Sequence, residues 1–78
     1  MKTSEELIQA LTEERAELLP KIHRLELFLI SDDSKKVDGE SSNLLWEQWE
    51  KMRDYEKTLC KRIAHERVKQ YNKENKEK

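Results

Sequence analysis

Residues 7–29 read LIQALTEERAELLPKIHRLELFL, and their apolar side chains recur at intervals of three and four residues. An α-helix turns once in 3.6 residues, so this spacing aligns the apolar side chains in one stripe. Thr3 and Glu6 precede the stripe at the spacing of a capping box, in which each side chain bonds an unpaired amide of the first turn. These features predict one long helix over about residues 4–31.

Pro20 lies in the middle of this expected helix. Proline lacks an amide donor, and its ring crowds the carbonyl four residues earlier. The chain either kinks there and continues, or it stops and starts again with Pro20 as the first residue of a new helix. The second alternative needs Leu19 as the N-cap, and leucine is a poor cap. Because the stripe keeps its register through Pro20, we favour a kinked, continuous helix.

A second helix is expected from about residue 39 to about residue 71, where apolar residues again recur at helical spacing. The connection at about residues 32–38 is rich in serine and aspartate, whose side chains compete for backbone hydrogen bonds and favour turns. Asp38 is the expected N-cap of the second helix, with Ser41 or Ser42 as the alternative.

Two long helices joined by a short loop lie antiparallel, so the predicted fold class is all-α, an antiparallel helical hairpin. We expect one domain over residues 1–71. The charged tail at residues 72–78 has no apolar side chain to hold it, and we expect it to fray.

The hairpin alone offers little apolar material, because 42% of the residues are charged. A chain of this length rarely gains more than about 3–5 kcal/mol from a single core. We therefore expect copies of the chain to assemble into an oligomeric helical bundle. Leu27, Ile30 and Trp46 lie off the two stripes and add to the apolar surface left for such contacts. The expected core and interface residues are Leu11, Leu18, Ile22, Leu25, Phe28, Leu45, Trp49, Met52, Leu59 and Ile63.

The sequence lacks the motifs of common catalytic and metal sites. A single glycine leaves no glycine-rich phosphate loop, and Cys60 has no second cysteine at zinc-ligand spacing. A lone cysteine fits a reducing compartment, so we expect a cytoplasmic location. No apolar run approaches the roughly 20 residues that span a bilayer. We expect no enzymatic activity, no metal, no cofactor and no membrane association.

The second helix carries basic side chains at intervals of four: Lys57, Lys61, His65, Lys69 and Lys73. Basic groups bind phosphates and aromatic rings stack on bases, and this helix has both. The alternative is that the lysines are solvated and balanced by neighbouring carboxylates. A net charge of −1 supplies no strong field for long nucleic acid, so a small anion is the favoured ligand.

Arg15 and Arg24 are further basic candidates on the first helix. Arg15 interrupts the apolar stripe, so its side chain is directed toward the helix interface, where a charge must be paired or bind something. We hypothesise that in an oligomer Arg15 of one copy meets the second helix of another copy and forms an anion site between subunits.

One further pattern of residues extends over about residues 13–63. It consists of Glu14, Arg15, Leu18, Lys21, Ile22, Leu25, Phe28, Leu29 and Ser31, followed by Leu44, Leu45, Gln48, Met52, Tyr55, Leu59, Arg62 and Ile63. With this pattern the chain resembles a family of small helical-hairpin proteins encoded by bacteriophages, including crAss-like phages. Pro20 departs from the first helix expected of that family.

Small helical phage proteins of this build include oligomeric sponges that sequester the cyclic nucleotides or cyclic ADP-ribose signals of bacterial immune systems. The resemblance implies an anti-defence protein that binds such a signal without cleaving it. It also implies that polar residues of the pattern contact the ligand: Arg15, Gln48, Tyr55 and Arg62. With the basic candidates added, the expected ligand-binding residues are Arg15, Arg24, Gln48, Tyr55, Lys61, Arg62 and His65.

The alternative function is that of a coiled-coil adaptor or inhibitor, which docks an apolar helix face on a host or phage protein. Leu27, Ile30 and Trp46 are then the expected docking surface, and Gln48 and Tyr55 specify helix register. A small regulatory nucleic-acid binder ranks below both.

Overall fold

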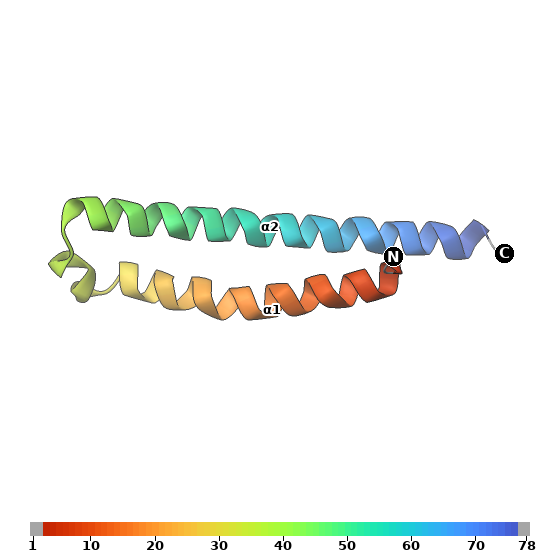
Figure 1. Cartoon of the computed structure of the whole chain (residues 1–78), viewed down its shortest axis with the longest axis horizontal. Coiled ribbons are helices and arrows are strands. Elements are labelled where there is room, and N and C mark those ends of the chain that lie inside the picture. The colour runs from red at the N-terminus through yellow and green to blue at the C-terminus, as the bar shows by residue number, and fades with distance from the viewer. Residues whose placement is uncertain (1–2, 77–78) are drawn as a thin grey trace.

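The computed structural model describes residues 3–76 as a hairpin of two long helices. Helix α1 spans Ser4–Leu29, a 3₁₀-helix η1 spans Asp32–Lys36, and helix α2 spans Gly39–Lys76 (Figure 1). The hairpin is elongated, with extents of 61 × 20 × 16 Å. The predicted all-α fold, an antiparallel helical hairpin, is confirmed.

Helix α1 begins where the sequence predicts. The backbone amide of Glu6 donates to Oγ1 of Thr3 at 3.2 Å, which makes Thr3 the N-cap. The helix continues through Pro20, so the continuous alternative is confirmed, and Figure 1 shows α1 as one gently bowed ribbon. It ends at Leu29, two residues before the expected end, because the Ser31 hydroxyl bonds the Phe28 carbonyl oxygen at 2.6 Å and favours a turn.

Asp38 caps helix α2, as predicted, because its Oδ2 accepts a hydrogen bond from the Ser41 amide at 3.1 Å. Hydrogen bonds from the side chain and the backbone amide of Ser41 hold the pKa of Asp38 below its usual value. Helix α2 reaches Lys76, which is five residues past the expected end near Tyr71, and the expected fraying of the tail stays a prediction. Lysine and glutamate propagate a helix once it has been nucleated, which accounts for the extension. Residues 77–78 of the expected tail lie outside the described part of the chain.

The core is a thin seam between the helices. Leu11, Leu59 and Ile63 form its centre, with Leu7, Ile8 and Leu18 packed against them. Of the ten expected core residues, four are buried and six are half-buried. The buried residues are Leu11, Ile22, Leu59 and Ile63, and the half-buried ones are Leu18, Leu25, Phe28, Leu45, Trp49 and Met52.

The start of α1 lies against α2 well before the end of α2, so α2 projects past it (Figure 1). The Ser4 hydroxyl donates to Oε2 of Glu66 at 3.1 Å, and Lys69 Nζ lies 3.5 Å from the other carboxylate oxygen of Glu66. This carboxylate is buried and has partners on both oxygens, which satisfies the requirement for a buried charge.

Among the described residues, neither helix contains a segment apolar and long enough to cross a bilayer.

Candidate functional site

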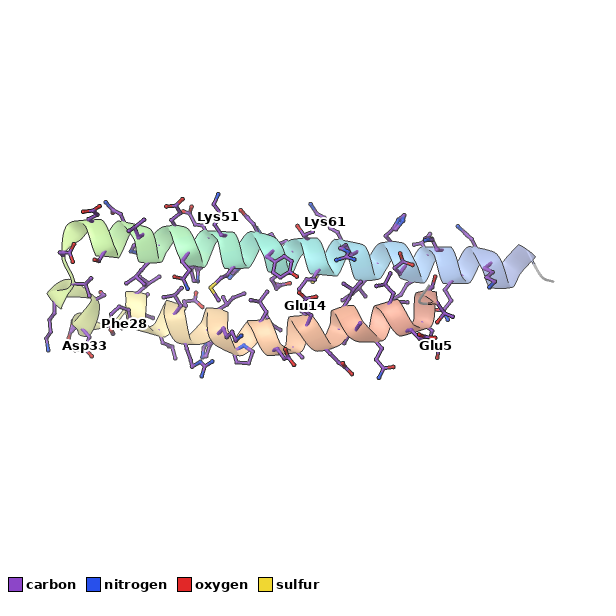
Figure 2. The ribbon with its side chains drawn as sticks, viewed as in Figure 1. Glu5, Glu14, Phe28, Asp33, Lys51 and Lys61 are labelled. Atoms are coloured by element: carbon purple, nitrogen blue, oxygen red, sulfur yellow. The ribbon has the colours of Figure 1, made fainter. Side chains whose placement is uncertain are left out.

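Two polar contacts join the helices at the same level, on opposite sides of the apolar seam. Arg15 Nε lies 3.2 Å from Glu56 Oε2, and the Tyr55 hydroxyl donates to Glu14 Oε1. Neighbouring residues of a helix point about 100° apart. Glu14 and Arg15 therefore point to opposite sides of the seam, and each meets one of the neighbouring residues Tyr55 and Glu56 on α2. Figure 2 shows Glu14 directed from α1 toward α2. The seam therefore has an Arg15 side and a Tyr55 side.

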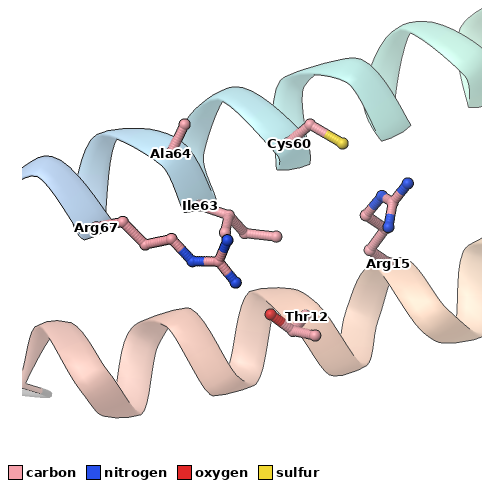
Figure 3. A pocket seen from close by; sticks show the side chains of 6 residues that line it. All are labelled: Thr12, Arg15, Cys60, Ile63, Ala64 and Arg67. Atoms are coloured by element: carbon pink, nitrogen blue, oxygen red, sulfur yellow. The ribbon is translucent and has the colours of Figure 1, made fainter.

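An open-sided cavity of about 500 Å³ lies on the Arg15 side. Its α2 residues are spaced three and four apart, so they share one flank of that helix. Figure 3 shows that two side chains come from α1 and four from α2, and that Ile63 lies between the two arginines. The lining residues, called the arginine cavity below, are Thr12, Arg15, Cys60, Ile63, Ala64 and Arg67.

A hydrogen-bond network supports Arg15 at one end of the arginine cavity. Glu56 Oε2 accepts from Arg15 Nε at 3.2 Å and from Cys60 Sγ at 2.9 Å. The bond from Cys60, followed by that from Arg15, lowers the pKa of Glu56 from its usual value. The Glu56 carboxylate in turn raises the pKa of the Cys60 thiol, and desolvation adds to this effect. The thiol is therefore protonated at neutral pH and is a poor nucleophile.

Arg67 forms the other end of the arginine cavity. Its guanidinium reaches into the space between the helices (Figure 3), and no ion pair joins it to a carboxylate within the described part of the chain. Thr12 contributes a wall, and its hydroxyl is already bonded to the Ile8 carbonyl oxygen at 2.7 Å. The cavity thus has a positive charge from each helix and the apolar side chains of Ile63 and Ala64 beside them.

The arrangement supports binding of an anion better than it supports catalysis. Guanidinium groups pair with phosphate and carboxylate oxygens, often through two hydrogen bonds. Cys60 has a raised pKa, and the one base that faces it among the described residues is the Glu56 carboxylate, which accepts its hydrogen bond. Within residues 3–76 there is no group of three His, Cys, Asp or Glu side chains placed to bind a metal ion.

The structure brings only one of the expected ligand-binding residues into this cavity. Arg15 lines it, whereas Tyr55 lies across the seam, where the hydrogen bond to Glu14 raises the pKa of its hydroxyl and the charge of Arg62 offsets part of this effect. Gln48 is exposed, and its amide lies 3.9 Å from Met52 Sδ. Arg24, Lys61 and His65 are also exposed, and Figure 2 shows Lys61 pointing away from α1. Within one chain the seven residues do not form a single site.

The expected site residues do not include five residues of this region, Thr12, Glu56, Cys60, Ala64 and Arg67, although Arg67 flanks the row of basic side chains on the second helix. Arg15 already meets α2 of its own chain, and the hypothesis that it also meets the second helix of another copy stays a prediction. The sequence did contain one signal for these residues, namely their spacing. Cys60 follows Glu56 by four residues and precedes Arg67 by seven, which places the three side chains on one flank of α2.

A second cluster lies nearer the loop. Trp46 and Trp49 meet edge to face with ring centroids 5.8 Å apart, and the Arg53 guanidinium lies 5.4 Å from the Trp49 ring centre. Trp49 Nε1 is buried and has no hydrogen-bond partner among the described residues. A depression of about 260 Å³ borders Trp49, Glu50, Arg53, Asp54 and Lys57. Its charges are mixed and lie on one helix only, so it is the weaker candidate for an anion.

Comparison with known proteins returns one family. No curated protein and no solved structure matches the chain. The family model described as Sequestin matches residues 5–65, which include nearly all of α1, the loop, α2 as far as His65 and all of the arginine cavity except Arg67. The name of the family suggests a sequestering, non-catalytic role. Because the match covers well over half of the chain, this protein belongs to the Sequestin family.

Proposed function

We propose that this protein is a non-catalytic phage anti-defence protein that sequesters a small anionic nucleotide signal, either a cyclic nucleotide or cyclic ADP-ribose. The observation that carries the proposal is the arginine cavity, in which Arg15 of α1 and Arg67 of α2 approach one space from opposite helices. The family name and the resemblance to phage proteins support the same function.

The dimensions and chemistry of the cavity fit a nucleotide. Small-molecule sites usually enclose about 300–1,000 Å³, and the arginine cavity encloses about 500 Å³. The two guanidinium groups can hold phosphate oxygens, while Ile63 and Ala64 offer an apolar surface to a sugar or base. The raised pKa of the Cys60 thiol, the nucleophile of this cavity, favours binding of the ligand over its cleavage.

Assembly into an oligomer is part of the proposal. The chain exposes 6377 Å², whereas a compact monomer of its mass exposes about 5,000 Å² by the usual scaling of area with mass. Exposed apolar side chains remain on both helices, among them Leu19, Trp46 and Val68. Packing against further copies removes such surface from water, which stabilises a hairpin with so thin a core.

Native mass spectrometry of the purified protein with a panel of cyclic dinucleotides, cyclic trinucleotides and cyclic ADP-ribose isomers tests the function. We expect one discrete oligomer that takes up a fixed number of one nucleotide and releases it unchanged. Arg15→Ala and Arg67→Ala should each abolish uptake. Arg24→Ala, which removes the same charge from an exposed position outside the cavity, should not. Uptake that survives both cavity variants would refute the site, and no uptake of any nucleotide would refute the function for this panel.

A second candidate function is docking on another protein. Exposed apolar side chains surround the loop end of the hairpin, where Leu27 is 50%, Ile30 71% and Leu44 58% exposed. Large apolar groups in such positions favour contacts with a partner. If this function holds, replacing all three by Ser abolishes co-purification of the partner from infected cells, while Arg15→Ala leaves it intact.

A further inference from the structure

The guanidinium of Arg15 is already occupied along one edge. An arginine side chain has five N–H donors, one on Nε and four on the two terminal nitrogens. Glu56 Oε2 accepts from Nε at 3.2 Å, and Cys60 is the other described residue that interacts with the Arg15 side chain. The terminal nitrogens, which form the edge best suited to a two-oxygen contact with phosphate, therefore remain for a ligand in the cavity.

Glu56 is well placed to hold Arg15, because it is the less exposed partner. Its side chain is only 16% exposed, against 39% for Arg15. A second bond, from Cys60 Sγ at 2.9 Å, ties the same carboxylate oxygen to the wall of the cavity. Arg53 also lies near enough to favour the charged form of Glu56. The Glu56 carboxylate is therefore ionised at neutral pH and is held by two hydrogen bonds at one oxygen.

The same carboxylate opposes an incoming anion. Arg15, Arg67 and Glu56 together carry a net charge of +1, rather than the +2 of the two arginines alone. A ligand that contacts only Arg15 meets a guanidinium already neutralised by Glu56, so it gains little. A ligand that spans the cavity and reaches Arg67 as well meets a second guanidinium with no such partner within the described chain.

We propose that Glu56 is the positioning and specificity-determining residue of the arginine cavity: it holds the Nε edge of Arg15, and its charge restricts binding to anions that reach Arg67 as well. This inference rests on the proposed function, since it concerns the same cavity. The ligand class is thereby narrowed to anions that reach both arginines, with at least two phosphoryl groups or with a phosphoryl group and a second anionic group.

Glu56→Gln separates the two roles of this residue. Glutamine keeps the size of the side chain and an acceptor oxygen for Arg15 Nε, but it removes the negative charge. Glu14→Gln is the matched control, because it removes the same charge at the same level of the hairpin on the Tyr55 side of the seam. Thermal unfolding monitored by circular dichroism establishes that both variants are folded before binding is measured.

Isothermal titration at constant ionic strength, with inorganic pyrophosphate and inorganic phosphate as probes, gives the binding test. We expect Glu56→Gln to bind pyrophosphate roughly threefold to tenfold more tightly than the natural protein, because one nearby repulsive charge is removed. We also expect it to lose part of the preference for pyrophosphate over phosphate. Glu14→Gln should bind both probes as the natural protein does, and Arg15→Ala and Arg67→Ala should bind neither.

The rate of Cys60 alkylation by iodoacetamide as a function of pH tests the network without any ligand. The Glu56 carboxylate raises the thiol pKa and Arg15 lowers it, so Glu56→Gln should move the profile to lower pH and Arg15→Ala to higher pH. Unchanged or weaker pyrophosphate binding in Glu56→Gln would overturn the role of Glu56, while the site itself would stand if Arg15→Ala still abolished binding. Pyrophosphate binding that ignores Arg15→Ala and Arg67→Ala would overturn the proposed function together with this inference.

Discussion

Arg15 Nε lies 3.2 Å from Oε2 of Glu56, so the charge that interrupts the apolar stripe of α1 is paired across the hairpin with α2 of the same chain. This pair lies on the side of the seam that holds the arginine cavity. It also gives the Cys60 thiol its hydrogen-bond acceptor, because both groups bond the same carboxylate oxygen. Because these contacts lie beside the apolar seam, substitutions there are expected to change both the stability of the hairpin and its binding of ligands.

The first prediction concerns the centre of the seam. Leu59 is completely buried, and it packs in the cluster with Leu11 and Ile63. Leu59→Ala should lower the free energy of unfolding by about 2–5 kcal/mol, because the cavity it leaves adds to the lost burial. With so thin a core, much of the helical signal in circular dichroism should disappear at 37 °C. Leu44→Ala removes the same atoms from a side chain that is 58% exposed, and its effect should stay within about 0.5 kcal/mol.

The second prediction concerns Pro20, which lies inside α1 and is exposed. Proline removes one helical hydrogen bond and crowds the preceding turn, so Pro20→Ala should stabilise the hairpin by about 1–3 kcal/mol in urea unfolding. Lys21→Ala, at the next exposed position, serves as the control for helix propensity and should change stability far less. A loss of stability in Pro20→Ala would mean that the bow of α1 is needed to seat Ile22 and Leu18 in the seam.

The third prediction is a dependence of stability on pH. The pKa values of Asp38 and Glu56 are lowered from 3.8 and 4.5 in the folded protein. A carboxyl group with a lowered folded pKa stabilises the fold above its unfolded pKa, and this contribution is lost as the pH falls through the folded value. Thermal midpoints should therefore decrease as the pH is lowered below about 4.5, the ordinary pKa of Glu56.

Glu56→Gln is the diagnostic variant for this acid sensitivity. It removes the titrating group but keeps an acceptor for Arg15, so its thermal midpoint should decrease less steeply with falling pH. Identical pH profiles for the variant and the natural protein would show that other carboxyl groups dominate acid unfolding.

The fourth prediction separates the two sides of the seam. Tyr55 bonds Glu14 on the side opposite the arginine cavity, and Arg62 lies near that hydroxyl. Tyr55→Phe and Arg62→Ala should leave nucleotide binding by the arginine cavity unchanged when measured by isothermal titration. A tenfold or larger loss of affinity in either variant would contradict this, and would place the ligand where the resemblance to phage proteins implies, around Gln48, Tyr55 and Arg62.

The fold was largely predictable from local features. Periodic apolar residues, the Thr3 cap and the Asp38 cap specified two long helices, and each of these is a relation among residues a few positions apart. The errors also have local causes. Ser31 ended α1 early by bonding a carbonyl, and the lysines and glutamates after Tyr71 extended α2.

The candidate site was much less predictable, because it depends on how one helix is set against the other. Arg15 could be predicted because it interrupts an apolar pattern. Its partner Glu56 lies 41 residues away, and nothing in the sequence distinguishes it from the other glutamates of the second helix. Arg67 flanks the row of lysines and Cys60 lies among basic residues, but neither position indicates a cavity shared with Arg15. The row of lysines was predicted as a candidate anion-binding surface, but Lys61 points away from α1 (Figure 2).

The sequence by itself determined that this protein is two long helices joined by a short loop, because helix formation depends on propensity, capping and a repeat of 3.6 residues. Only the tertiary structure decided that Glu14 and Arg15 part around the seam and that Arg15 shares a cavity with Arg67. The physical reason is that the packing of Leu11 against Leu59 and Ile63 sets the rotation and register of α1 against α2. That register decides which side chains of two distant segments meet.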